Sequence, residues 1–310
     1  MVPDEVHIEI DGAFRAIDSA FTLNRTRYAE AARVTSEPST TEPIVDVQGI
    51  SHSYQKGTTA LRDVSVKIRQ GDFIAIVGRN GSGKTTFAKH MNALLKPNSG
   101  QVLFRGKPVS RMKISEVARQ VGFVFQNPDS QIFCETIEDE VRFGPTNLGY
   151  GKEETERLVA EAIATVGLKG LEGSDPFSLT KGERQRIAIA STLACNPEVL
   201  ILDEPTTGLD YTQERSIMSM LERLNKEGKT IIIITHSLHL VSEFAHRVVV
   251  FKEGSVAFDG PVRDLFEPKN EDLLAQSGLA LPKIAELSHR FGITALSVSE
   301  FAAFFDRRES

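Results

Sequence analysis

The sequence Gly78-Arg79-Asn80-Gly81-Ser82-Gly83-Lys84-Thr85-Thr86 decides the fold, and it follows the apolar run Phe73-Ile74-Ala75-Ile76-Val77. It matches the pattern G-x-x-x-x-G-K-[ST], which requires a buried strand before it and a helix, here predicted between Thr86 and Leu94, after it. Glycines let the backbone turn its N–H groups towards an anion, and the helix N-terminus adds its positive dipole end. The pattern therefore predicts a loop that binds the phosphates of a nucleoside triphosphate.

Two side chains of this loop have specific expected roles. Lys84 is predicted to reach the β- and γ-phosphates, and the hydroxyl of Thr85 to bind Mg²⁺. A glycine-rich loop that binds nothing is the alternative, and it is uncommon when lysine and threonine both stand at the required positions. The predicted nucleotide-binding residues of the loop are Gly78, Arg79, Asn80, Gly81, Ser82, Gly83, Lys84, Thr85 and Thr86.

Composition and charge narrow the class of protein. The chain has 310 residues of which 40% are hydrophobic, enough for one large domain or two modest ones. Its formal net charge of −6 argues against a nucleic-acid-binding surface as its main feature. Apolar runs such as Ile231–Ile234 are far shorter than the roughly 20 residues that span a bilayer. The first residues carry acids rather than a basic region, so we expect no secretory signal and a cytosolic protein.

The order of polar and apolar segments predicts three regions. Residues 35–43 contain no apolar residue and two prolines, which is typical of a linker. The preceding residues 1–34 are too few to form a core alone, so we expect 1–43 to be an N-terminal extension and linker. Residues 44–260 are expected to form the main domain. Residues 261–310, with an amphipathic segment at 284–291, are expected to form a small accessory region packed on that domain.

The main domain alternates between strand-like and helix-like runs. The predicted strands cover 44–49, 62–68, 72–77, 101–105, 121–125, 198–203, 230–235 and 246–251. The predicted helices cover 85–94, 152–166, 182–194, 211–226 and 238–245. Because helices alternate with buried apolar strands, the predicted fold class is α/β with a mostly parallel sheet.

A second group of polar residues follows the strand Val199–Leu202, which ends in Asp203-Glu204. In proteins with a phosphate-binding loop, such a strand lies beside the loop and its first acid holds Mg²⁺. The next acid, Glu204, is then placed to orient and polarise the attacking water as a general base. Two acids at a strand end can also form a helix cap or a solvated turn. The phosphate-binding loop in the same chain favours the functional interpretation.

Three further residues are candidates for the same site because of where they occur along the chain. Thr235-His236 ends another buried strand, where His236 is expected to contact the γ-phosphate or the attacking water, although a lone histidine is usually structural or simply exposed. Tyr54 precedes the phosphate loop, and its ring can stack on a purine. Gln126 ends the strand 121–125. Taken singly, Tyr54 and Gln126 would be unremarkable surface residues, so their order along the chain carries the argument.

In this order the motifs resemble those of ATP-binding cassette (ABC) ATPases, from about Ile44 to Gly260. The resemblance implies a P-loop ATPase fold with a helical subdomain, and ATP and Mg²⁺ as the nucleotide and metal. It implies an adenine-stacking ring at Tyr54 and catalytic roles for Gln126, Glu204 and His236. It further implies Mg²⁺ ligands at Thr85, Gln126 and Asp203. The segment Thr180–Glu183 resembles the signature motif, with nucleotide contacts at Thr180 and Gly182, and Gly208-Leu209-Asp210 resembles the D-loop.

A closer resemblance is to the energy-coupling factor branch of this family, which drives uptake of vitamins and of cobalt or nickel ions. The segments that carry it are Gln126–Gln131, Glu140–Pro145, Asn147–Gly149, Gly278–Pro282, Ala285–Leu287 and His289–Gly292. It implies a head-to-tail dimer with a second ABC ATPase, of the same or a related chain. It also implies a transmembrane coupling subunit, a substrate-binding membrane subunit, no nucleic acid, and a peripheral location on the cytoplasmic face of the cell membrane. Residues 1–43 lie outside the resemblance.

The signature motif departs from the family pattern Leu-Ser-Gly-Gly-Gln, because this chain has Leu179-Thr180-Lys181-Gly182-Glu183. Lys181 stands where the family has glycine. Its ammonium opposes the dipole of the helix that begins there, unless the triphosphate of a partner cassette attracts it. The other arrangement is a side chain that points into solvent. The sequence leaves both arrangements open.

Two other functional classes compete with the importer subunit. One is a soluble ABC ATPase without a transporter partner, which would act on nucleic acid, ribosomes or cluster assembly. The other is an exporter subunit, which is less favoured because exporter cassettes are often fused to their membrane domains. The segment 126–149 favours the importer subunit, since it suits a groove that receives a helix of a membrane partner.

Overall fold

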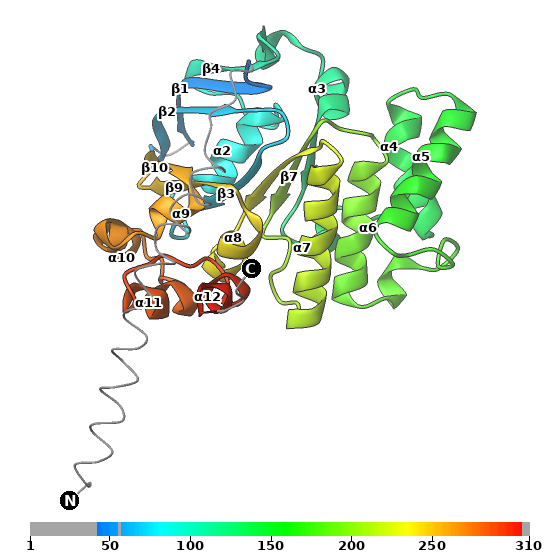
Figure 1. Cartoon of the computed structure of the whole chain (residues 1–310). Helices are drawn as coiled ribbons and strands as arrows, with labels where there is room; N and C mark the ends of the chain where they lie inside the picture. The colour runs from blue at the N-terminus through cyan, green and yellow to red at the C-terminus, as the bar shows by residue number, and fades with distance from the viewer. Residues whose placement is uncertain (1–41, 55–56, 306–310) are drawn as a thin grey trace, which may run out of the picture.

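The structure is a computed structural model, and it describes residues 42–54 and 57–305 (Figure 1). The expected tail at 1–34 and most of the expected linker lie outside the described residues. Two sheets form the framework: a four-stranded sheet of order β2-β1-β4-β5 and a six-stranded sheet of order β10-β9-β3-β8-β7-β6. The strands of the second sheet are β3 (Phe73–Val77), β6 (Val121–Val124), β7 (Val199–Asp203), β8 (Thr230–Ile234), β9 (Arg247–Lys252) and β10 (Ser255–Pro261).

The larger sheet is parallel from β9 to β6, as the alternating pattern predicts, and only β10 pairs antiparallel with β9. Every residue of β3, β7 and β8 is buried, which is why these strands are continuous apolar runs such as Thr230-Ile231-Ile232-Ile233-Ile234. Their apolar side chains enter two separate hydrophobic clusters, one on each face of the sheet. The sheet therefore forms the middle layer of the molecule.

A second, smaller sheet adds to the mostly parallel sheet that the sequence predicts. It consists of β1 (Val45–Ser53), β2 (Thr59–Ile68), β4 (Ser99–Phe104) and β5 (Lys107–Pro108), all paired antiparallel. The connection between β1 and β2 has only five residues, whereas a parallel pair needs a crossover of about a dozen or more. These strands therefore form a layer of their own, which packs with α2 on one face of the larger sheet.

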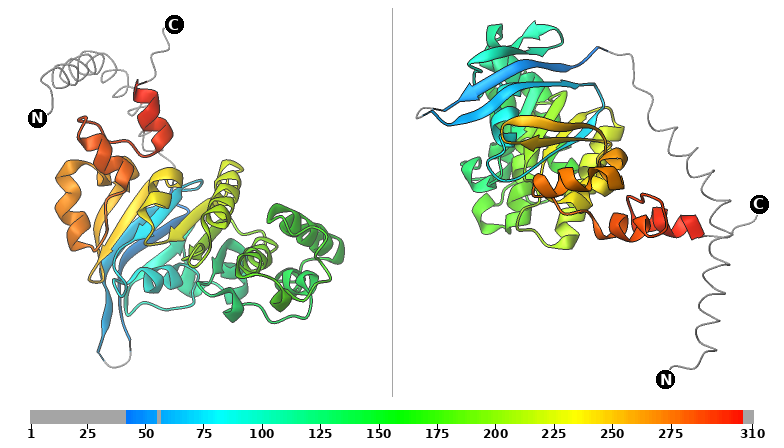
Figure 2. Two further views of the ribbon diagram at one scale, coloured as in Figure 1. Left: turned by 90° about the horizontal axis from the view of Figure 1, so that it is seen from below. Right: turned by 90° about the vertical axis from the view of Figure 1, so that its left-hand side faces the viewer.

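Helices cover both faces of the larger sheet and extend beyond it. They are α2 (Lys84–Met91), α3 (Ile114–Gln120), α4 (Ile137–Asn147), α5 (Lys152–Thr165), α6 (Lys181–Leu193), α7 (Tyr211–Lys226), α8 (Leu238–Phe244), α9 (Val262–Leu265), α10 (Glu271–Gln276), α11 (Lys283–His289) and α12 (Val298–Phe305). The side chains of α6, α7 and α8 pack on the face opposite α2. In Figures 1 and 2 the helices α4, α5 and α6 form a group at one end of the molecule, and α9 to α12 lie at the other.

α4 is the longest of the helices that the sequence patterns do not predict, and it contains Gly144 and Pro145. It is held by its N-cap, where Thr136 Oγ1 accepts a 3.1 Å hydrogen bond from the backbone N–H of Asp139, and by contacts with α5 and α6. Gly144 permits close packing at the end of α6, since a Cβ at this position would lie 2.5 Å from Sγ of Cys195, just after that helix, and 3.4 Å from the carbonyl oxygen of Ser191. Tertiary packing thus outweighs the weak local helix propensity.

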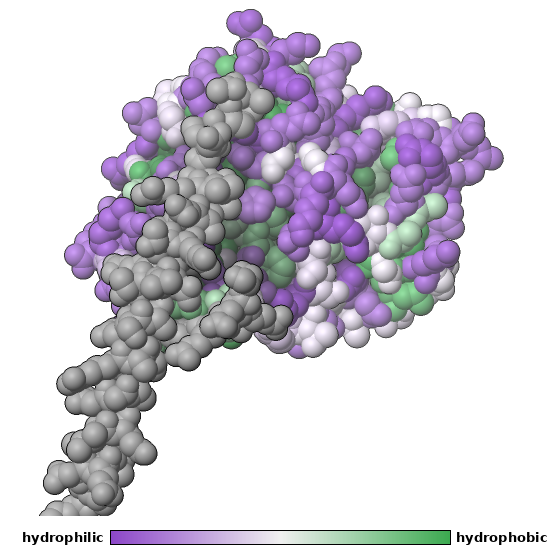
Figure 3. All heavy atoms as spheres, in the orientation of Figure 1, coloured by the Kyte–Doolittle hydropathy of each residue, from purple (hydrophilic) through white to green (hydrophobic). Residues whose placement is uncertain are grey.

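The C-terminal region shares the core of the main domain. Leu265 and Phe266 are fully buried, and they belong to the same hydrophobic cluster as the inward side chains of β3, β8 and β9. In the part of the chain that is described, no helix has the length and apolar character needed to cross a bilayer. The face shown in Figure 3 is largely hydrophilic, with smaller apolar areas, one of them beside α4 to α6.

The buried ring of Phe266 tests this shared core. We expect Phe266→Ala to lower the free energy of unfolding of the whole chain by about 3–5 kcal/mol, the usual cost of removing a buried aromatic ring. Chemical denaturation measures this change. Val298→Ala is the control, since Val298 is 72% exposed and its truncation is expected to change little. A Phe266→Ala variant with wild-type stability would show that the C-terminal region is a separate unit.

Candidate nucleotide-binding site

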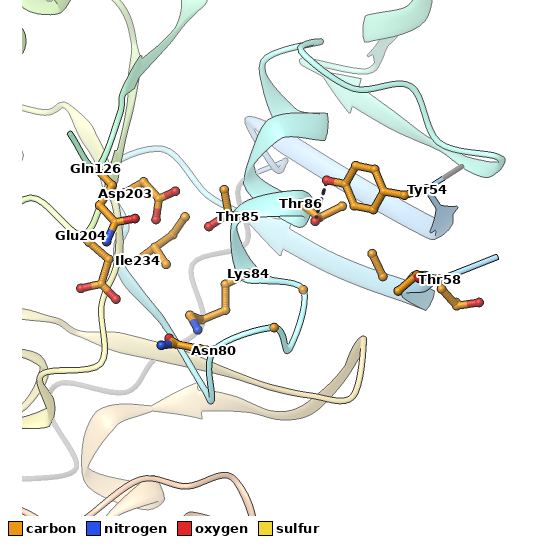
Figure 4. Close-up of a pocket in the computed structure, with 14 residues that line it drawn as sticks. Tyr54, Thr58, Asn80, Lys84, Thr85, Thr86, Gln126, Asp203, Glu204 and Ile234 are labelled. Atoms are coloured by element: carbon orange, nitrogen blue, oxygen red, sulfur yellow. Dashed lines mark hydrogen bonds between the residues drawn. The ribbon is translucent and has the colours of Figure 1, made fainter. Parts of the chain in front are cut away.

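A cavity of about 410 Å³ opens where the carboxyl ends of β3, β7 and β8 meet. The phosphate-binding loop forms one wall, the acids Asp203 and Glu204 at the end of β7 form another, and Tyr54 lies at the far side (Figure 4). The lining residues are Tyr54, Thr58, Thr59, Ala60, Asn80, Gly81, Gly83, Lys84, Thr85, Thr86, Gln126, Asp203, Glu204 and Ile234. Ten residues predicted from the sequence as nucleotide, metal or catalytic residues are therefore brought together around one cavity.

The phosphate-binding loop packs tightly against the sheet at its first glycine. Gly78 has a φ of 143°, and a Cβ at this position would lie 2.2 Å from the carbonyl oxygen of Phe251. No other residue could hold the loop in this position. Lys84 Nζ donates hydrogen bonds of 2.8 and 2.9 Å to the carbonyl oxygens of Gly78 and Arg79. An ammonium has three donors, so one donor besides these two can reach an anion in the loop.

The charge of Lys84 is balanced between burial and two acids. Burial lowers the pKa of Lys84, and the nearby carboxylates of Glu204 and Asp203 act in the opposite direction. An anion in the loop would likewise favour the charged ammonium. A phosphate bound in the loop would therefore stabilise the positive charge of the Lys84 ammonium.

Thr85, Gln126 and Asp203 supply a hydroxyl, an amide and a carboxylate oxygen to the same cavity. These are the hard oxygen ligands that Mg²⁺ prefers, so the donor set fits this ion. The pKa of Asp203 is raised because burial disfavours its charge, while a hydrogen bond from Thr85 lowers it. Among the described residues no group of three or more His, Cys, Asp or Glu side chains could hold a metal ion. A site with one carboxylate suits Mg²⁺, which proteins usually bind through one or two carboxylates together with phosphates of a ligand.

Glu204 is held in an unusual backbone conformation beside these ligands. Its φ is 50°, in the left-handed region that residues other than glycine rarely adopt. Its carboxylate accepts a 3.0 Å hydrogen bond from Thr207 Oγ1, and His236 Nδ1 lies 2.9 Å from each of its oxygens. The side chain of Glu204 is only 11% exposed, whereas that of His236 is 64% exposed. The carboxylate is therefore fixed by neighbours on two sides.

Tyr54 lies across the cavity from the acids (Figure 4). Its hydroxyl is 3.0 Å from Thr86 Oγ1, and its ring packs edge-on against His52 with ring centroids 4.8 Å apart. Tyr54 as a whole remains 44% exposed, so it is accessible to a planar ligand. This position suits the base of a nucleotide whose phosphates lie in the loop.

Six predicted site residues do not line the cavity. Arg79 and Ser82 line a different cavity of about 310 Å³ that also includes Gln276 and Ser277. His236 contacts Glu204 from outside the cavity, and the backbone of Gly78 supports the loop through its carbonyl. The other two, Thr180 and Gly182, lie at the start of α6.

The signature segment forms a capping box. The backbone N–H of Glu183 bonds Thr180 Oγ1 at 3.4 Å, and the carboxylate of Glu183 accepts a 2.9 Å bond from the N–H of Thr180. In this single chain the Lys181 side chain does not extend freely into solvent. Its Nζ donates a 2.8 Å hydrogen bond to the carbonyl oxygen of Thr207, in the loop after β7.

Sequence reasoning missed several residues that shape the site. Thr58, Thr59 and Ala60 line the cavity from the start of β2, and no motif marks them. Thr207 was missed although it directly precedes the D-loop-like segment Gly208–Asp210. Its position between two recognised motifs is the signal that could have indicated it.

Comparisons with known proteins agree with this geometry. A family model described as ABC transporter matches residues 61–207. The putative ABC transporter ATP-binding protein TTE1589 of Caldanaerobacter subterraneus subsp. tengcongensis is 45% identical over 295 residues. That match covers 94% of this chain and 52% of the relative, so the chain spans about half the length of that protein.

Two further similarities cover most of the related chain. The energy-coupling factor transporter ATP-binding protein EcfA of Methanocaldococcus jannaschii is 42% identical over 246 residues, which are 79% of this chain and 88% of EcfA. The solved structure of cbiO1 from Clostridium perfringens, described as part of the ABC transporter complex cbiONQ, has a TM-score of 0.69 and 36% identity. It covers 80% of this chain and 100% of cbiO1. The chain therefore belongs to the ATP-binding proteins of ABC transporters, in the energy-coupling factor group, a family that hydrolyses ATP.

Proposed function

We propose that this chain is the ATP-hydrolysing subunit of an energy-coupling-factor-type importer, which couples ATP binding and hydrolysis to uptake of a vitamin or a transition-metal ion. The observation that carries the ATPase part is the Glu204 carboxylate, held by Thr207 and His236 at the edge of a cavity that also contains Lys84 and Asp203. Similarity to EcfA and cbiO1 supports the importer part.

The residues of the cavity have distinct tasks in the proposed reaction. Tyr54 stacks on the base, and the loop N–H groups with Lys84 bind the phosphates. Glu204 accepts the proton of the attacking water, while Thr207 and His236 keep its carboxylate oriented. Mg²⁺, held by Thr85, Gln126 and Asp203, would neutralise charge on the phosphates when bound. Gln126 also connects the cavity with the segment that follows it.

The proposed assembly is a head-to-tail dimer with a second ABC ATPase. Thr180 and Gly182 are expected to contact nucleotide, yet they do not line the cavity of their own chain. A contact with nucleotide bound to a partner resolves this difference. The partner is either a second copy or a related ATPase.

An apolar groove beside Gln126 supports a membrane partner. The groove has a volume of about 300 Å³ and is lined by side chains from α3, α4, α6 and the segment after β6. Four aromatic and aliphatic side chains that line it are unusually exposed: Ile114 by 75%, Phe133 by 61%, Leu94 by 51% and Phe143 by 49%. Buried Glu140 holds this wall in place, because its carboxylate accepts 2.9 Å hydrogen bonds from the N–H groups of Phe133 and Cys134.

We therefore place the chain at the cytoplasmic face of the cell membrane, attached through a transmembrane coupling subunit that works with a substrate-binding membrane subunit. Purification from detergent-solubilised membranes distinguishes this function from a soluble ABC ATPase. Recovery of the chain with two membrane subunits supports the importer. Recovery with ribosomes or nucleic acid, and with no membrane subunit, would refute it.

The first prediction concerns the general base. Glu204→Gln removes the proton acceptor but keeps the size of the side chain. We expect ATP affinity to stay near wild type, while the hydrolysis rate falls by about two to four orders of magnitude. The variant should also accumulate an ATP-bound dimer, which sedimentation measures. Hydrolysis close to the wild-type rate would remove Glu204 from the mechanism.

The second prediction concerns phosphate binding. Lys84→Ala deletes the ammonium that faces the phosphates, so we expect weaker binding of ATP itself, in contrast to Glu204→Gln. Equilibrium titration with a fluorescent ATP analogue measures the Kd. Lys89→Ala provides a matched control, since Lys89 lies on the same helix and does not line the cavity. Equal affinity of the Lys84→Ala variant and the control would contradict the role of Lys84.

The third prediction concerns the groove. Phe143→Ser removes an exposed ring from the proposed docking surface, and we expect the affinity for the membrane subunit to fall by roughly tenfold or more. ATP binding should be unchanged. Val298→Ser is the matched control, because Val298 is an exposed apolar residue outside the groove. Co-purification with the membrane subunits measures the effect, and equal recovery of both variants would argue against docking at this groove.

A further inference from the structure

The bond between Lys181 and Thr207 joins two parts of the chain that lie 26 positions apart. Lys181 is the first residue of α6, and Thr207 lies in the loop between β7 and α7. Gly208 permits the close approach, since its φ is 78° and a Cβ there would lie 2.7 Å from Lys181 Nζ. The carbonyl oxygen also compensates the ammonium, which otherwise opposes the dipole at the start of α6. The loop after β7 therefore has a shape that accommodates the Lys181 ammonium.

Thr207 also contacts Glu204 through two other atoms. Its hydroxyl donates the 3.0 Å hydrogen bond to the Glu204 carboxylate, and its N–H donates a 3.2 Å hydrogen bond to the Glu204 carbonyl oxygen. The carbonyl oxygen of Thr207 is the atom that accepts from Lys181. One residue thus connects the lysine of the signature segment with the carboxylate that is expected to activate water.

We propose that Lys181 is a positioning residue for ATP hydrolysis, which acts on the Glu204 carboxylate through Thr207. The ammonium fixes the loop after β7, so that the hydroxyl of Thr207 keeps the carboxylate in its orientation. This inference rests on the proposed role of Glu204 as the general base. In the proposed dimer, Thr180 and Gly182 of the same segment face the nucleotide of the partner. The bond from Lys181 then links the nucleotide site of one cassette with the carboxylate that serves the other.

A positioning role and a phosphate-binding role of Lys181 predict different kinetics. Loss of a positioning hydrogen bond lowers kcat and leaves the KM for ATP unchanged, because the substrate does not touch the lysine. A lysine that binds the phosphate of the partner would instead change the KM and the salt dependence of dimer formation. Lys181→Met separates the two roles, since methionine keeps most of the side-chain length and has no donor.

The experiment measures steady-state ATP hydrolysis by the full chain in complex with its membrane subunits. We expect Lys181→Met to lower kcat by about fivefold or more, the order of one lost hydrogen bond to a charged group, with KM within about twofold of wild type. Lys181→Arg, which retains a cationic donor, should restore most of kcat. Lys152→Met is the matched control, because Lys152 is also the exposed first residue of a helix, α5. Thermal unfolding of each variant confirms that it is folded.

A double-mutant cycle tests whether the effect passes through Thr207. Thr207→Val removes the hydroxyl that holds Glu204, and Thr207→Ser retains it. If Lys181 acts through Thr207, the variant with both Lys181→Met and Thr207→Val should have the same kcat as Thr207→Val alone. If the two substitutions lower kcat independently, so that the double variant is slower than Thr207→Val alone, the inference is overturned. A raised KM of Lys181→Met for ATP would overturn it as well.

The Glu204→Gln variant separates this inference from the proposed function. If Glu204→Gln hydrolyses ATP at the wild-type rate, the proposed role of Glu204 fails, and the positioning role fails with it. If Glu204→Gln is inactive and Lys181→Met has wild-type kcat, only the inference on Lys181 fails.

Discussion

Parallel pairing of β3, β8 and β7 brings the ends of three strands to one edge of the sheet. The register aligns Ile76 of β3 with Ile234 of β8, and Ile234 in turn with Asp203 of β7. The phosphate-binding loop starts two residues after Ile76, so the loop and the acids meet at the same level. A slip of β7 by one residue would move Asp203 to the opposite face of the sheet. The geometry of the site is therefore set by the buried strands and not by the loops alone.

The loop after β7 contains a strained backbone conformation at Glu204. Glu204 adopts a left-handed backbone, which costs on the order of 1–3 kcal/mol for a residue other than glycine. Its N–H donates to the carbonyl oxygen of Ile234 at 2.9 Å, and Thr207 and His236 hold its side chain. These contacts maintain a conformation that the isolated segment would not prefer. They direct the carboxylate towards the cavity rather than towards solvent.

The sequence predicted the buried strands well, because a continuous apolar run that ends in a polar motif has few other interpretations. β7, expected at 198–203, covers Val199–Asp203. The pairing of β1, β2 and β4 into a second sheet was not predictable from periodicity, since antiparallel and parallel strands can have the same pattern. The cavity contains most of the expected residues. The contact of Lys181 with Thr207 depends on how the N-terminus of α6 packs against the loop after β7. The local sequence carries no information on this packing.

Position 278 shows how closely the C-terminal region approaches the phosphate-binding loop. Gly278 follows α10, and a Cβ at this position would lie 2.5 Å from Cγ of Arg79 in the phosphate-binding loop. Lys252, at the end of β9, donates a 2.8 Å hydrogen bond to Gln276 nearby. The outer side of the phosphate-binding loop is thus in van der Waals contact with the C-terminal region. As a consequence, any side chain at position 278 would have to displace that of Arg79, so the C-terminal region limits the space that the phosphate-binding loop can occupy.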